Sequence, residues 1–178
     1  MADAPKLRKI LGSPDAPYLD SLKELISSQS RETILKWCIN YVENNMLPIF
    51  EAAYPDDSRP REALSNARLY ISDEFGARQI RPLVFACHAA ARDANDNPAA
   101  QAAARACAQA SSSVYELGHT LGIAYYGAAA AAYAKVGYEA DAQTYEDLAA
   151  EECARLQAAL ADIAVEDEPD PCLIEWHM

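Results

Sequence analysis

Apolar side chains recur along this chain at intervals of three and four residues, which is the spacing of one face of an α-helix. A clear example is the run of Ile34, Trp37, Cys38 and Tyr41. The same pattern, joined by the high helix propensity of alanine in 98–113, predicts helices over residues 18–27, 31–53, 59–75, 77–94, 98–113, 117–136 and 139–165. We therefore expect an all-α fold, a single-domain bundle of six to seven helices in which strands play no part.

Prolines and glycines divide these helices. Pro48 lies inside the second predicted helix and should kink it, or make it restart, near residues 46–47. Asp57 or Ser58 can cap the next helix, with Pro60 in its first turn, where a missing N–H is tolerated. Three consecutive serines, residues 111–113, should bend the chain, and Gly137 should end the helix that follows.

The stretch from Leu117 to Ala134 has no charged residue and is mostly alanine and glycine. Its spacing places His119, Gly122 and Tyr126 on one face of a helix with a thin surface. The run is near the minimum length for crossing a membrane, but alanine and glycine contribute little transfer energy. We interpret it as the central helix of a bundle in water, with no membrane partner.

Charge is distributed unevenly along the 178 residues. The net charge is −12, and residues 96–178 carry 14 acidic side chains against three basic ones. An acidic half of this kind repels nucleic acid and attracts basic partners, although it also serves simply to keep a protein in solution. By composition we divide the chain into a flexible arm (1–17), a helical domain (18–165) and an acidic and apolar tail (166–178).

The five cysteines have no CxxC spacing, which indicates small buried side chains in a reducing compartment rather than a metal site or disulfide framework. The first residues contain no apolar run suited to a signal peptide, and we predict a cytoplasmic protein. Phosphate-binding loops, nucleophile elbows and dinucleotide-binding glycines are absent. No cofactor, metal or catalytic residue is predicted.

Two histidines are the strongest candidates for chemistry. His88 and His119 lie on helices expected to be neighbours, and a small-ligand or enzyme site could form there with Tyr126, Trp37 and Arg68. No metal-binding motif accompanies them, so the plainer expectation is that each imidazole is hydrogen bonded within the fold. Similarly, the arginines at 59, 61 and 68 are expected to pair within the fold, with Asp56, Asp57 and the acidic half of the chain.

Three stretches resemble the Imm-5-like immunity proteins, a helical family from bacterial polymorphic toxin systems. They are LPIFEAAYPDDSRPREALSNAR (47–68), ACHAAARDANDNPAAQAAARA (86–106) and GHTLGIAYYGAAA (118–130), within a likeness that covers about residues 38–135. The chain departs from the family pattern at residues 111–115, before the central helix. The resemblance implies an all-α cytoplasmic protein that is not an enzyme and neutralises a cognate toxin by binding it.

An acidic surface suits a basic toxin, such as a nuclease domain, and would speed association. The carboxylates that we expect to contact it are Glu139, Asp141, Glu146, Asp147, Glu151, Glu152, Glu166, Asp167 and Glu168. A further alternative is a structural protein that forms a homodimer through the apolar tail residues Leu173, Ile174 and Trp176.

Overall fold

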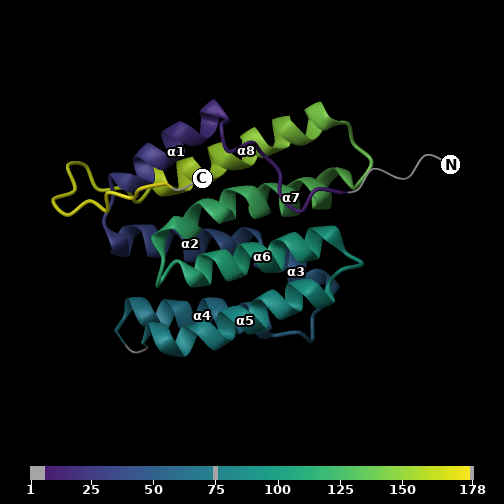
Figure 1. The fold of residues 1–178 in the computed structure, drawn as a ribbon, viewed down its shortest axis with the longest axis horizontal. Helices are drawn as coiled ribbons and strands as arrows, with labels where there is room; N and C mark the ends of the chain where they lie inside the picture. Colours follow the sequence, from purple (N-terminus) through teal and green to yellow (C-terminus); the bar gives the residue numbers. More distant parts are fainter. Residues whose placement is uncertain (1–6, 74–75, 177–178) are drawn as a thin grey trace.

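The computed structural model describes residues 7–73 and 76–176, and within these ranges it contains only helices and their connections (Figure 1). The all-α prediction is confirmed. The elements are α1 (Pro17–Ser27), α2 (Arg31–Asn45), α3 (Leu47–Ala53), α4 (Arg59–Ile71), α5 (Ala77–Asp93), α6 (Pro98–Ser112), the 3₁₀ helix η1 (Leu117–Leu121), α7 (Gly122–Val136) and α8 (Ala142–Ala161).

The helices are stacked so that the two ends of the chain share one outer layer. In Figure 1, α1 lies beside α8 at the top, α7 and α6 follow beneath them, and α4 and α5 form the opposite outer layer. Helix α2 lies behind the centre and contacts α4, α6 and α8. The bundle therefore has two outer faces on opposite sides, one built from α1 and α8 and the other from α4 and α5.

Two alanine-rich helices share the centre of the bundle. Helix α6 contacts α2, α3, α4, α5 and α7, and nearly all of its alanines are fully buried. Helix α7, predicted to be the centre, lies between α6 and α8. Because alanine side chains are small, α6 can be approached from several sides at once.

The predicted 117–136 helix is two elements. Residues 117–121 form the 3₁₀ helix η1, and α7 begins only at Gly122. The bend before it is confirmed: the hydroxyls of Ser112 and Ser113 both donate to the carbonyl of Gln109 (3.0 and 2.9 Å), which also accepts the Ser113 N–H at 3.1 Å where α6 ends. Glu116 then accepts from the Gly118 N–H and caps η1.

Other predicted boundaries hold to within a few residues. The chain restarts at Leu47 with Pro48 in the first turn of α3, as expected. Gly137 ends α7 with a φ of 73°, a conformation that glycine adopts without strain. The last helix begins later than predicted, because the Asp141 carboxylate caps it through the Thr144 N–H at 2.8 Å, and it ends earlier, at Ala161.

The segments outside the helices are attached to the bundle. Leu11 of the expected flexible arm is 3% exposed and donates its N–H to the Tyr125 carbonyl, which anchors this point of the arm to α7, whereas residues 8–10 and 13–15 are exposed. The rest of that arm, residues 1–6, lies outside the described residues. Among the described helices, none combines the length and the apolar character needed to cross a membrane.

Candidate functional site

The outer layer built from the two ends of the chain concentrates the negative charge. Residues 15–24 and 139–175, here called the acidic layer, carry fifteen acidic side chains and two basic ones. Helices α1 and α8 pack side by side within it (Figure 1). Since the whole chain has a net charge of −12, this layer accounts for essentially all of the excess.

Most of the carboxylates selected from the sequence lie on the surface of this layer. Glu146 and Glu168 are half-buried, and Glu146 accepts a hydrogen bond from the Tyr18 hydroxyl at 2.9 Å. Glu151 lies near the cations Lys135 (3.4 Å) and Arg155 (3.8 Å). The exposed members are Glu139, Asp141, Asp147, Glu151, Glu166 and Asp167.

Glu152 was placed on the partner surface by its sequence position, and that placement is wrong. Its side chain is 1% exposed and points into the bundle. The Tyr41 hydroxyl of α2 donates to Oε1 at 2.5 Å, and the Arg155 guanidinium donates to Oε2 at 2.5 and 2.9 Å. Glu152 therefore joins α8 to α2 and cannot contact a partner.

The N-terminal helix contributes acidic residues that sequence reasoning did not select. Asp20 and Glu24 are exposed, and they stand four residues apart on α1, hence on the same face of that helix. They join the acidic layer because α1 packs against α8 across more than a hundred residues of sequence. Their only sequence signal was an acidic outer face on a short amphipathic helix.

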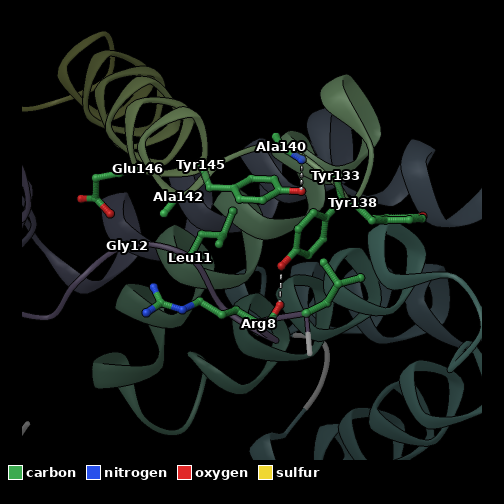
Figure 2. A pocket seen from close by; sticks show the side chains of 10 residues that line it. Arg8, Leu11, Gly12, Tyr133, Tyr138, Ala140, Ala142, Tyr145 and Glu146 are labelled. Atoms are coloured by element: carbon green, nitrogen blue, oxygen red, sulfur yellow. Dashed lines mark hydrogen bonds between the residues drawn. The ribbon is translucent and has the colours of Figure 1, made fainter. Parts of the chain in front are cut away.

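A cavity of about 360 Å³ lies at the end of this layer, between residues 7–12 and the α7–α8 connection (Figure 2). Tyr133 donates its hydroxyl to the Arg8 carbonyl (2.6 Å), and Tyr145 donates to the Gly137 carbonyl (2.9 Å). The rings of Tyr133 and Tyr145 meet edge to face at 5.5 Å. Because these hydroxyls are bonded to backbone, the cavity presents mainly ring surface and apolar side chains.

The five-residue pocket predicted around the histidines does not form as a unit. Trp37 is buried against α8, where its indole N–H donates to the Leu156 carbonyl at 3.0 Å. Arg68 lies on α4 and pairs with Glu43 and Asn40 of α2. Both residues are committed to helix packing, so their assignment to that pocket is corrected.

The remaining three residues do lie in one region, together with an arginine that was not selected. The Cys87 thiol donates to the Ala104 carbonyl (3.2 Å), which sets the register of α5 against α6 and brings His88 alongside Arg105. The Arg105 guanidinium lies over the Tyr126 ring at 6.0 Å. His119 meets the Tyr115 ring at 6.0 Å.

Neither imidazole has a hydrogen-bond partner among the described residues, so the expectation of hydrogen-bonded histidines is wrong. The Nδ1 atom of His119 is shielded from solvent as well. The pKa of His88 is lowered, mainly by burial and then by the charges of Arg105, Arg92 and His119. The sequence feature that could have drawn attention to Arg105 is that it is the only charged residue of the alanine-rich segment 98–113.

The arginines around the start of α4 pair within the fold as predicted, but of the expected partners only Asp57 is used. Arg59 bonds Asp57 (2.6 Å) and Asp93 (2.8 Å), and Arg61 bonds Glu51 (2.6 Å). With the Arg68–Glu43 pair, these partners all come from the first 93 residues rather than from the acidic half. Internal pairing leaves the acidic layer uncompensated.

The tail offers less apolar surface for a homodimer than its sequence suggested. Ile174 and Trp176 are partly buried against the bundle, and the Cys172 N–H donates to the Gln29 carbonyl at 2.8 Å. Leu173 remains exposed, at 84%. The last two residues, 177–178, lie outside the described chain.

Across the described residues, no group of three or more His, Cys, Asp or Glu side chains is arranged to hold a metal ion. Among protein families, the model described as "Imm-5 like putative immunity protein" matches residues 24–159. Comparison with curated proteins gave no match, and comparison with solved structures gave none either.

Proposed function

The chain belongs to the Imm-5-like family of putative immunity proteins, and from this membership we propose that it binds a cognate bacterial toxin and neutralises it. The binding surface in this proposal is the acidic layer, and the toxin is a basic protein. Inhibition results from occupying the toxin, without a chemical step catalysed by this chain. The five free thiols suit a reducing compartment, so we place the encounter in the cytoplasm.

The observation that carries the proposal is the separation of charge between the two outer layers. Fifteen of the 27 acidic side chains belong to the acidic layer, whereas the arginines of α4 are paired internally. A predominantly negative face steers a basic partner toward one side of the molecule and raises the rate of association by about ten- to a thousand-fold. It also disfavours nucleic acid as a ligand of the same face.

The first test is capture of the protein encoded by the neighbouring gene with the full-length chain. We expect a one-to-one complex with a basic protein that arrests growth when expressed alone, and restored growth when both are expressed together. Absence of a complex, combined with growth arrest that this chain does not relieve, would refute the proposal.

The second test assigns the surface. The double reversal Asp147→Lys with Glu166→Lys should slow association with the toxin at least about tenfold at low salt. A matched control is Asp56→Lys with Glu62→Lys, on or beside the opposite layer. Both double variants change the net charge by the same amount. Each also removes one carboxylate that accepts a hydrogen bond from a side chain four residues earlier: Asp147 accepts from Gln143, and Glu62 accepts from Ser58. Equal effects of the two pairs would exclude the acidic layer as the binding surface.

A further inference from the structure

Four arginines on α5 and α6 make no ion pair, although the chain has 27 acidic and 15 basic side chains. Within the described residues, Arg78, Arg81, Arg92 and Arg105 have no carboxylate partner. Residues 77–92 of α5 contain no acidic side chain at all. This face therefore has positive charge that the fold itself does not neutralise.

Arg105 is the centre of this face, because α6 lies between α5 and α7 (Figure 1). The Gln101 amide donates to the Ala91 carbonyl (2.9 Å), which, with the Cys87–Ala104 bond, aligns the two helices over this length. One turn along α6 from Gln101, Arg105 faces His88 on one side and the Tyr126 ring on the other. His119 enters the same region from η1.

Two polar atoms at this junction are shielded from solvent and unbonded. They are Arg105 Nε and His119 Nδ1, and the structure records no other such side-chain atoms among the described residues. A buried donor without an acceptor is costly, and native folds rarely keep one without a use for it. That both occur in one cluster of cationic side chains indicates a missing acceptor that carries negative charge.

The surrounding groups supply no such acceptor. Arg81 lies over the Tyr115 ring at 5.0 Å, and Arg92 adds to the positive potential at His88. Glu116 is the acidic residue beside η1, and its carboxylate caps the Gly118 N–H at 3.3 Å. Burial, and then the charges of these cations, lower the pKa of His88, so a bound anion would favour its protonated form.

We propose that Arg105, His88 and His119 form a binding site for a phosphate group, where α5, α6 and η1 meet. A guanidinium supplies planar, fixed donors, and two imidazoles approaching from different elements can reach other oxygens of a tetrahedral anion. Several donors converge on one point here, so a tetrahedral oxyanion, which offers several acceptor oxygens, is preferred over a single carboxylate. The site is independent of the acidic layer and of any toxin.

The test is a titration of the full-length protein with inorganic phosphate at pH 6, followed by NMR of the imidazole C–H protons. Three histidines give few signals, and the variants His88→Gln and His119→Gln assign the two of interest. We expect saturable shifts of both, and an affinity that falls as pH rises through the imidazole range. Phosphoserine in place of inorganic phosphate distinguishes a phosphomonoester ligand from the free anion.

Arg105→Met keeps the side-chain stem and should weaken phosphate binding at least about tenfold, because it removes the charge-assisted donors. Arg78→Met is the matched control. Like Arg105, Arg78 has no carboxylate partner, but it is exposed and lies near the start of α5, so its loss should leave the affinity for phosphate unchanged. If Arg105→Met fails to fold, His119→Gln gives the same comparison. Shifts that do not saturate, that chloride reproduces at equal ionic strength, or that survive both variants would overturn the site. Toxin capture tests the immunity role separately.

Discussion

Removing the buried carboxylate of Glu152 should destabilise the protein more than removing any other carboxylate of the acidic layer. The change is Glu152→Ala. It removes the acceptor of the Tyr41 hydroxyl and the partner of Arg155, at a side chain that is 1% exposed. Asp147, an exposed acid of the same helix, makes no bond to another helix.

The magnitude follows from the burial of each partner. A hydrogen bond to a charged group contributes about 1.5–3 kcal/mol, and an abandoned buried hydroxyl costs about 1–3 kcal/mol. Arg155 is 51% exposed, so water replaces most of what it loses, and its share is below about 1 kcal/mol. We expect Glu152→Ala to lower the free energy of unfolding by about 3–4 kcal/mol. Tyr41→Phe leaves Glu152 paired with Arg155 and should cost about 1.5–2 kcal/mol.

Urea denaturation followed by circular dichroism measures these values, with Asp147→Ala as a control expected within about 0.5 kcal/mol of the parent. The double variant Tyr41→Phe with Glu152→Ala should cost less than the sum of the single changes by about 1–2 kcal/mol, since no hydroxyl is then left unpaired. A loss below about 1 kcal/mol for Glu152→Ala, or strict additivity, would show that the carboxylate is solvated and refute this reasoning.

Three further outcomes are expected. Gly127→Ala should raise the free energy of unfolding by about 0.5–1 kcal/mol in the same denaturation assay, because alanine favours the helical conformation of α7 and its added Cβ would lie at van der Waals distance, 3.6 Å, from Met46. Gly122→Ala is the control: its added Cβ would lie only 2.5 Å from the Gln109 side chain, so no gain in stability is expected. Ellman's reagent should modify only Cys172 rapidly in the native protein, since the other four cysteines are buried; a second fast thiol would contradict the packing. Burial raises the pKa of Cys38 and Cys87 from 9.0 to about 12, so unfolded chains lose protons that folded ones keep. The free energy of unfolding should therefore fall between pH 9 and 12, and less steeply in Cys38→Ala, as urea titrations at several pH values would test.

Helix positions could be predicted because local chemistry sets them. The spacing of Ile34, Trp37 and Tyr41 requires one buried face, and Pro48 and Gly137 each impose a backbone conformation that interrupts a helix. The 3₁₀ form of residues 117–121 was missed, since it arises from a cap and a serine bend whose combined effect spacing does not encode.

The site depended on tertiary partners and was therefore predicted only in part. Glu152 looks like its neighbour Glu151 in sequence, and only the position of Tyr41 on α2 decides that one is buried and the other exposed. Asp20 joined the acidic layer because α1 packs on α8, a pairing that no local pattern specifies. Arg105 was recognised as a candidate ligand-binding residue only from the structure, because the register of α5 against α6 places it beside His88.

Because the acidic layer forms only when α1 packs against α8, it cannot assemble until α8 has been synthesised. Helix α1 (Pro17–Ser27) leaves the ribosome long before α8 (Ala142–Ala161), and its buried side chains Leu19, Leu22 and Ile26 have no permanent cover in that interval. At about 5–20 residues per second, the delay is on the order of ten seconds. A nascent or prematurely terminated chain would thus present an uncovered apolar helix, a target for chaperones and proteases, and only the chain extended through α8 would display the assembled negative face.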